Sequence, residues 1–210
     1  MDPDASESEP ARVVGLVLAG GRASRMGSGH NKMLAALEGK PLIAHSVDAA
    51  LGAGLAEVWV ATGYEAEQVR AALAGRRVRF AHNPDFASGM ASTLRAGLLA
   101  TGPDCDAVAV LLGDMPRVRA DDIRRLVAAF EQSARRAICV PVHGGRRGNP
   151  VLWPASEWGA LLAVTGDTGG RELLRARDAQ LVRVPIEHPG VLLDIDTQSD
   201  LAEVATRERR

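Results

Sequence analysis

The chain has 210 residues and a formal net charge of −1 at pH 7, and 3% of its residues are aromatic. A net charge this close to zero excludes electrostatic binding to nucleic acid or to a membrane surface. The small number of aromatic side chains excludes a stacking surface for single-stranded bases. The length is enough to bury one large hydrophobic core. We therefore expect partners that are small molecules, with no nucleic acid and no membrane among them.

The first residues read MDPDASESEP and are acidic and polar, whereas a secretory signal begins with basic and apolar residues. We expect residues 1–11 to form a disordered acidic tail and residues 12–210 to form a single domain. The apolar runs are shorter than the roughly 18 residues of a membrane helix. Cys105 and Cys139 lack metal-ligand spacing, which favours reduced thiols and a cytoplasmic protein.

Strand and helix patterns alternate along the chain. Short apolar runs typical of buried strands occur at residues 13–18, 57–62, 77–82, 107–112, 137–142, 150–153 and 181–185. Helical patterns occur at residues 41–53, 66–74, 90–100, 120–132, 156–164 and 170–176, and a last helix is expected to run from its cap at Thr197 toward Glu203. This alternation predicts an α/β protein with three αβα layers, Rossmann-like, around a mostly parallel sheet of about seven strands.

The first apolar run leads into a glycine-rich, basic segment, VVGLVLAGGRASRMGSGHNK, over residues 13–32. The glycine pair Gly20-Gly21 lets the backbone approach a ligand closely, and Arg22, Arg25 and Lys32 supply positive charge for a polyphosphate. The spacing fits neither G-x-x-x-x-G-K-[ST] nor G-x-G-x-x-G. A glycine-rich turn with solvated charges is the alternative, but the combination predicts a nucleotide-binding loop.

Polar residues follow other predicted strands, at the sheet edge where ligands bind in open α/β folds. They include Thr62 and Asn83. After Asn83, the predicted helix at Met90 is preceded by Ser88 and Gly89 and carries Ser92 in its first turn. Such a helix start can receive anions or ribose oxygens through its free N–H groups, or Ser88 or Ser92 can simply cap it.

Carboxylates occur at two further places in this pattern. Asp114 follows the apolar run at residues 107–112, where a carboxylate is well placed to hold Mg²⁺, although it could also serve as a turn or cap residue. Asp194 and Asp196 share a face if their segment is extended, and either could instead cap the terminal helix.

Two glycine-rich turns carry arginines. Residues 144–151 read GGRRGNPV, and residues 166–171 read GDTGGR before a helix. Turn chemistry with surface arginines explains both segments, but residues 144–149 also follow a predicted strand at the ligand-binding edge of the sheet.

Together these segments resemble the molybdenum cofactor nucleotidyltransferase family (MobA-like NTP transferases), and most of all its cytidylyltransferases. The signature L-A-[AG]-G-x-S-x-R-M-G followed by lysine is matched at Leu18, Ala19, Gly20, Gly21, Arg25, Met26, Gly27 and Lys32. Ala23 stands where the family has serine, with Ser24 beside it. Four further motifs follow in the family's order.

The resemblance implies a fold like that of the nucleotide-diphospho-sugar transferases and a Mg²⁺-dependent transfer of CMP from CTP to the phosphate of molybdopterin, with pyrophosphate released. Mn²⁺ is the alternative ion. Arg25, Lys32 and Asp114 would be catalytic, Asp114 with Asp196 (or, less favoured, Asp194) would hold the metal, and the acceptor would contact Arg147, Gly148, Asn149, Asp167 and Arg171. The nucleotide would contact Leu18, Ala19, Gly20, Gly21, Arg22, Arg25, Lys32, Thr62, Asn83, Ser88, Gly89, Met90, Ser92 and Asp114.

The base is the least determined feature. Gly20 is typical of the guanylyl members and alanine of the cytidylyl members, whereas the segments after residue 88 resemble the cytidylyl branch. The greater number of motifs favours CTP over GTP. A nucleotidyltransferase for a sugar or alcohol phosphate is a rival enzyme. A nucleotide-binding protein that delivers the cofactor to a molybdenum hydroxylase or dehydrogenase is the rival without catalysis.

Overall fold

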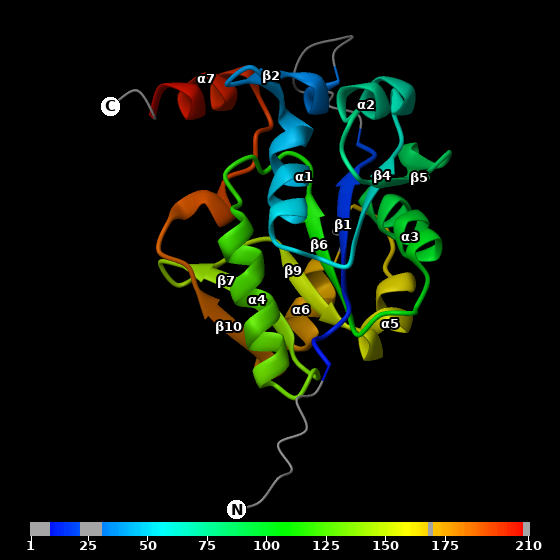
Figure 1. Cartoon of the computed structure of the whole chain (residues 1–210), viewed down its shortest axis with the longest axis vertical. Helices are drawn as coiled ribbons and strands as arrows, with labels where there is room; N and C mark the ends of the chain where they lie inside the picture. The colour runs from blue at the N-terminus through cyan, green and yellow to red at the C-terminus, as the bar shows by residue number, and fades with distance from the viewer. Residues whose placement is uncertain (1–8, 22–30, 168–169, 208–210) are drawn as a thin grey trace, which may run out of the picture.

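An eight-stranded sheet forms the middle layer of the protein (Figure 1). The computed structural model describes residues 9–21, 31–167 and 170–207. The strand order is β10-β7-β9-β6-β1-β4-β5, and β8 pairs with β7. The strands are β1 (Val13–Ala19), β4 (Glu57–Thr62), β5 (Arg79–His82), β6 (Ala107–Leu112), β7 (Ile138–His143), β8 (Arg146–Arg147), β9 (Val151–Pro154) and β10 (Leu181–Pro185).

The sheet is mostly parallel, as predicted. β1 pairs in parallel with β4 and β6, β4 with β5, and β10 with β7. β9 runs antiparallel between β6 and β7, and the two-residue β8 is antiparallel to β7. Because the parallel strands share a direction, the carboxyl ends of β1, β4, β5 and β6 meet at one edge, where the candidate site lies.

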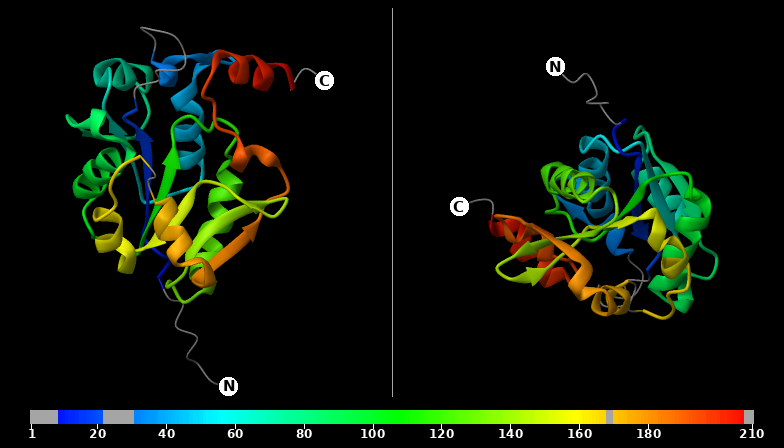
Figure 2. Two further views of the ribbon diagram at one scale, coloured as in Figure 1. Left: turned by 180° about the vertical axis from the view of Figure 1, so that it is seen from behind. Right: turned by 90° about the horizontal axis from the view of Figure 1, so that it is seen from below.

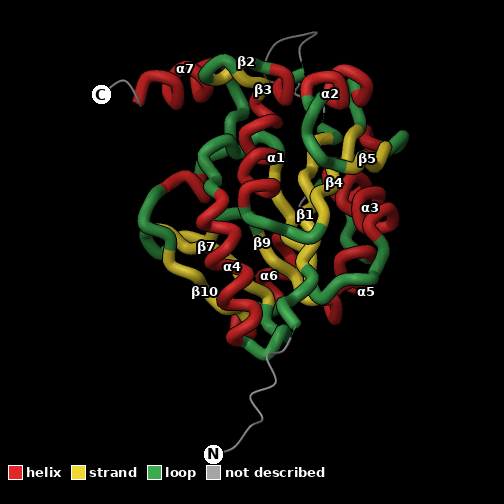
Figure 3. The backbone as a smooth tube through the Cα atoms, viewed as in Figure 1, coloured by secondary structure: helices red, strands yellow, loops and turns green. Residues whose placement is uncertain are grey.

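Helices cover both faces of the sheet (Figures 2 and 3). One face is covered by α1 (Leu42–Gly52), α2 (Ala66–Ala72) and α4 (Ala120–Gln132), and the other by α3 (Met90–Thr101), α5 (Trp158–Leu162) and α6 (Arg171–Ala176). The last helix, α7 (Gln198–Arg207), packs on a small hairpin of β2 (Ala36–Leu37) and β3 (Lys40–Pro41). Short 3₁₀ helices are η1 (Lys32–Leu34), η2 (Phe86–Ser88), η3 (Ala155–Glu157), η4 (Asp178–Gln180) and η5 (Pro189–Leu192).

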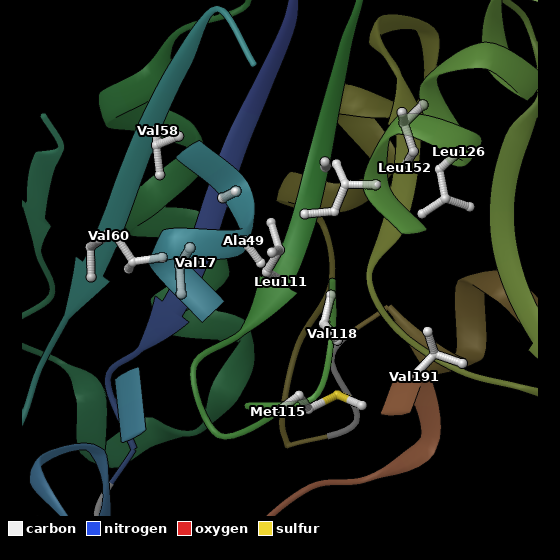
Figure 4. Close-up of a cluster of buried hydrophobic side chains, with 14 of the residues drawn as sticks. Val17, Ala49, Val58, Val60, Leu111, Met115, Val118, Leu126, Leu152 and Val191 are labelled. Atoms are coloured by element: carbon white, nitrogen blue, oxygen red, sulfur yellow. The ribbon is translucent and has the colours of Figure 1, made fainter. Parts of the chain in front are cut away.

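The two faces of the sheet carry separate hydrophobic cores because side chains alternate along each strand. In β1, Val17 belongs to the core beneath α1 and α4, whereas Leu16 and Leu18 belong to the core beneath α3 and α5. Figure 4 shows the first of these cores, with Val17 and Leu111 from neighbouring strands. Full burial of each such side chain stabilises the fold by about 1.5–3 kcal/mol.

Most predicted elements agree with the structure within two residues. Strands 57–62, 107–112 and 181–185 and helix 120–132 are confirmed at both ends. The helix expected at 156–164 is shorter by two residues at each end, because Pro154 leads into η3 and α5 covers residues 158–162, whereas the last helix extends to Arg207, beyond the expected Glu203. The β2–β3 hairpin was missed because each strand has two residues and its turn places Glu38 at an uncommon positive φ of 54°.

The amino-terminal segment is only partly described. Residues 1–8 of the predicted tail lie outside the described residues, while Ala11 donates its backbone N–H to Glu131 (3.0 Å) and the Glu9 carbonyl accepts from Arg135. No helix in the described ranges is long and apolar enough to cross a membrane.

Candidate active site

Lys32 bridges two carboxylates from distant parts of the chain. Its Nζ lies 2.6 Å from Asp114 Oδ2 and 2.8 Å from Asp196 Oδ1. The lysine and Asp114 are largely buried, with 12% and 17% of their side chains exposed, and Asp196 is 42% exposed. Burial alone would lower the pKa of Lys32, but the carboxylates of Asp114 and then Asp196 outweigh it and raise that pKa above its usual range. The ammonium is therefore held charged between them.

Asp114 is positioned by the tight turn that ends β6. Gly113 donates its N–H to the Leu18 carbonyl (3.0 Å), which joins this turn to the end of β1. A Cβ at residue 113 would lie 2.6 Å from Ile43 Cδ1 and 3.0 Å from the Leu18 carbonyl oxygen, so the turn requires glycine. Asp114 Oδ1 is buried and has no hydrogen-bond partner among the described residues.

Asp196 lies beside Lys32 and Asp114 because hydrogen bonds hold its backbone on both sides in the sequence. The Ile195 N–H donates to the Asp114 carbonyl (3.0 Å). The Asp200 carboxylate accepts the N–H groups of Asp196 (3.0 Å) and Thr197 (2.7 Å) at the start of α7. Hydrogen bonding to Thr197 and then to these N–H groups lowers the pKa of Asp200. Asp194 is exposed and does not line the cavity described next, which supports the preference for Asp196.

The Lys32 cluster opens into a cavity of about 550 Å³ beyond the carboxyl ends of the strands. Its lining is Leu18, Gly20, Gly21, Lys32, Met33, Phe86, Ala87, Gly89, Met90, Thr93, Leu112, Asp114, Asp167 and Asp196. Of the predicted nucleotide contacts, the lining contains Leu18, Gly20, Gly21, Lys32, Gly89, Met90 and Asp114. Arg22 and Arg25 lie outside the described residues.

Five predicted nucleotide contacts are not among the residues that line this cavity: Ala19, Thr62, Asn83, Ser88 and Ser92. Ala19 and Thr62 are 1% and 0% exposed, and the Thr62 hydroxyl donates to the Ala81 carbonyl (3.3 Å). Asn83 is also buried, and its side-chain N–H₂ donates to Ser92 Oγ (2.8 Å) and Thr93 Oγ1 (3.1 Å). The hydrogen bonds of Asn83 to Ser92 and Thr93 therefore hold the first turn of α3 in place.

The amino end of α3 is capped from a distant loop, and neither serine caps it. Ser88 and Ser92 both donate to backbone carbonyls, of Asp85 (2.7 Å) and Gly89 (2.7 Å) respectively. The Met90 N–H instead donates to Asp167 Oδ1 (3.3 Å), and the Ala91 N–H donates to the Gly166 carbonyl (3.1 Å). Asp167 thus stands at the helix start, where a carboxylate is favoured by the helix dipole.

A second cavity of about 280 Å³ adjoins the first, with Leu18, Met90, Leu112 and Asp167 common to both. Its floor is mainly apolar, and its further lining is Leu94, Val110, Arg147, Gly148, Asn149, Val151, Trp153, Leu161, Gly170, Arg171, Leu174 and Arg175. All five predicted acceptor contacts line it. Arg147 also donates to Asp178 (3.0 Å), which orients that guanidinium along the cavity edge.

The turn that carries Arg147 is packed against the segment that leads to Asp196. Asn149 donates its N–H to the Val191 carbonyl (2.9 Å), and a Cβ at Gly148 would lie 2.1 Å from that carbonyl oxygen. Glycine is therefore required at residue 148. The walls of the second cavity and the carboxylate cluster are thus parts of one packed unit.

Comparison with known proteins places the chain in a family. The profile described as "MobA-like NTP transferase domain" matches residues 15–183. The chain belongs to this family.

Solved structures of two similar proteins agree with this fold over nearly the whole chain. A nucleotidyl transferase from Methanothermobacter thermautotroptrophicus is 25% identical, with a TM-score of 0.80 over 93% of this chain and 97% of that one. Rv0371c from Mycobacterium tuberculosis H37Rv is 26% identical, with a TM-score of 0.78 over 93% and 98%. These similarities support the αβα fold with its mostly parallel sheet.

Curated relatives of this MobA-like chain are longer. The bifunctional protein GlmU of Sorangium cellulosum is 30% identical over 139 residues, which are 63% of this chain and 29% of the relative. The chain therefore spans less than a third of the length of that relative.

Several residues of the site were missed by sequence reasoning. Asn31 accepts the Met33 N–H (3.1 Å) and donates to the Tyr64 carbonyl (3.1 Å), which fixes the backbone of Lys32. The pattern N-K at the start of a short apolar segment was a signal for such a cap. Trp153 and Arg175 line the second cavity from the interior of a strand and of a helix, where the sequence pattern indicates only core or surface.

Proposed function

We propose that this MobA-like chain is a Mg²⁺-dependent nucleotidyltransferase that transfers CMP from CTP to the phosphate of a molybdopterin-type acceptor and releases pyrophosphate. The observation that carries the proposal is the Lys32–Asp114–Asp196 cluster at the mouth of the 550 Å³ cavity, beside a second cavity edged with arginines. The 550 Å³ cavity suits a nucleoside triphosphate. The adjoining cavity suits an acceptor whose phosphate points toward that nucleotide.

The residues present fit a magnesium ion that arrives with its nucleotide. Within the described part of the chain, no three His, Cys, Asp or Glu side chains are grouped to hold a metal alone. Mg²⁺ usually takes one or two carboxylates and completes its shell with substrate phosphates and water. Asp114, with its buried and unpartnered Oδ1, and Asp196 supply such a pair. Mn²⁺ would suit the same oxygens.

The second cavity supports an acceptor with a flat, weakly polar body and an anionic group. Its lining includes the apolar residues Val110, Val151 and Leu174, together with Arg171 and Arg175. A sugar, with hydroxyls around its whole ring, would leave many of them unpaired against such a lining. A pterin plane against the apolar lining, with its phosphate toward the arginines, suits this cavity better.

In the proposed reaction, a phosphate oxygen of the acceptor attacks the α-phosphorus while the bond to the bridging oxygen of the leaving pyrophosphate breaks. Lys32, with Arg25 of the preceding loop, would neutralise the charge that develops on the leaving phosphates. An ion held by Asp114 and Asp196 would supply Lewis-acid polarisation of phosphate oxygens. The attacking phosphate is already ionised at neutral pH, so no general base is required.

Pyrophosphate release tests this proposal. The purified protein is given CTP, GTP, ATP or UTP with Mg²⁺ and either molybdopterin cofactor or a sugar 1-phosphate. We expect release with CTP and the pterin acceptor, and its loss in Asp114→Asn. Release only with the sugar phosphate would favour the rival transferase. Nucleotide binding without release under any condition would favour the cofactor-delivery protein, with a molybdenum hydroxylase or dehydrogenase as its partner.

A further inference from the structure

Residue 20 is in direct steric contact with helix α3. A Cβ at Gly20 would lie 2.3 Å from Thr93 Oγ1 and 2.8 Å from Thr93 Cγ2. Both distances are far shorter than van der Waals contact. A Cβ at the neighbouring Gly21 would meet no atom within 4 Å. The requirement for glycine therefore applies at residue 20 and does not extend to residue 21.

Rotation of the Thr93 side chain cannot make room. Its two heavy substituents occupy two of three staggered positions, so at least one of the two crowding positions stays filled in every rotamer. The Thr93 Cβ itself would remain 3.1 Å from the added atom. Thr93 is 3% exposed, and its hydroxyl accepts from Asn83. Leu94 and Leu98 of α3 are buried in the core, so the helix cannot move away at low cost.

Gly20 is held from its other side as well. The Tyr64 N–H donates to the Gly20 carbonyl (3.4 Å), and a Cβ at Gly63 would lie 2.6 Å from that oxygen. The backbone that begins the nucleotide loop is thus confined between the end of β4 and α3. Because Gly20 and Thr93 both line the 550 Å³ cavity, this confinement sets the shape of the cavity wall.

We infer that Thr93 is a positioning residue that dictates glycine at position 20, so that Gly20 in this chain does not select guanine. Thr93 occupies the volume that a side chain on residue 20 would take, and the two residues form one steric pair. The conflict between Gly20 and the cytidylyl-like segments then disappears. The inference rests on the proposed function only where it concerns the choice of base.

A double-mutant cycle on the protein without ligand tests the steric pair. Gly20→Ala should lower the melting temperature by about 2–10 °C through overpacking. Gly20→Ala with Thr93→Ala should melt higher than Gly20→Ala alone, because the new methyl group fills the space vacated by threonine. Gly21→Ala is the matched control for melting and should stay within about 2 °C of wild type. A Gly20→Ala protein as stable as wild type, or effects that simply add in the double variant, would overturn the pair.

Binding of CTP and GTP to the same proteins tests the choice of base. Gly20→Ala should weaken CTP binding about tenfold, because the displaced loop changes the cavity wall, a loss of about 1.4 kcal/mol. The double variant should recover most of this affinity and keep the wild-type ratio of CTP to GTP affinity. A shift of that ratio toward CTP by more than about tenfold in the double variant would overturn the inference, because residue 20 would then read the base. If wild type binds no triphosphate, the proposed function fails, while the melting cycle still decides the steric pair.

Discussion

Lys32 Nζ lies 2.6 Å from Asp114 Oδ2, although the two residues are 82 positions apart in the chain. The lysine comes from the segment after β1 and the aspartate from the turn after β6, and these strands are neighbours in the sheet. The pairing of β1 with β6 therefore brings together the lysine that we propose to bind the polyphosphate and the carboxylate that we propose to bind the metal. Asp196 joins them at 2.8 Å from the same nitrogen.

Replacement of Lys32 by methionine should abolish most turnover while keeping the apolar stem. Loss of one preplaced charge opposite a leaving group commonly costs about 10²–10³ in kcat, and we expect a loss of that size in pyrophosphate release. Lys40→Met is the matched control, because Lys40 is the other lysine of the sequence and its exposed side chain pairs with Asp48 (3.2 Å). Turnover of Lys32→Met within about threefold of wild type would refute the role of the lysine.

Binding of Mn²⁺ without nucleotide should respond in opposite directions to two substitutions at the cluster. Lys32→Met should raise the affinity about tenfold or more, because the ammonium no longer competes with the ion for both carboxylates. Asp114→Asn should lower it, because an anionic ligand is lost. Titration followed by the paramagnetic resonance of free Mn²⁺ measures both. Equal affinities in Lys32→Met and wild type would show that the ion binds elsewhere.

Arg171→Ala and Arg175→Ala should impair use of the acceptor without affecting the nucleotide. Each removes a cation from the lining of the second cavity, and a lost charged hydrogen bond to phosphate costs about tenfold or more in affinity. We expect a raised KM for the acceptor and an unchanged Kd for CTP. Arg125→Ala, on the exposed side of α4 across the sheet, is the control. Equal acceptor KM values in all these proteins would contradict the assignment of the cavity.

Stability should decline in alkali because of Cys139. Burial raises the pKa of its thiol from 9.0 to about 11. Between these values the unfolded chain loses the thiol proton and the folded protein keeps it, so the free energy of unfolding falls as pH rises, by about 1 kcal/mol at pH 10. Denaturant unfolding at pH 8 and pH 10 measures this. Cys139→Ala should reduce this decline, whereas an unchanged decline would assign it to other groups, among them Cys105, whose thiol pKa burial also raises.

Much of the fold could be predicted because its strands are short apolar runs and its helices are amphipathic. The ends of β4 and β6 and the whole of α4 follow directly from hydrophobic pattern and turn residues. The β2–β3 hairpin could not be predicted, because two-residue strands carry no periodicity and Glu38 adopts an uncommon backbone conformation.

The positions of site residues could be predicted where a polar side chain directly follows a strand. They could not be predicted where side-chain packing determines whether that side chain faces the cavity. Lys32 and Asp114 converge as expected from the edge at which parallel strands end, whereas Asp196 follows no strand and was expected beside them only from the resemblance. Thr62 and Asn83 also follow strands, yet both side chains are buried and hydrogen-bonded behind the cavity. The contact of Gly20 with Thr93 joins residues far apart in sequence, and no local pattern reveals it.

The fate of labelled CTP tests the central claim most directly. The protein is incubated with Mg²⁺, the pterin acceptor and CTP carrying ³²P at either the α or the γ position. We expect the α label in a covalent acceptor–CMP product and the γ label in pyrophosphate, in equal amounts. Release of γ label as inorganic phosphate, or α label that never leaves the free nucleotide pool, would contradict nucleotidyl transfer.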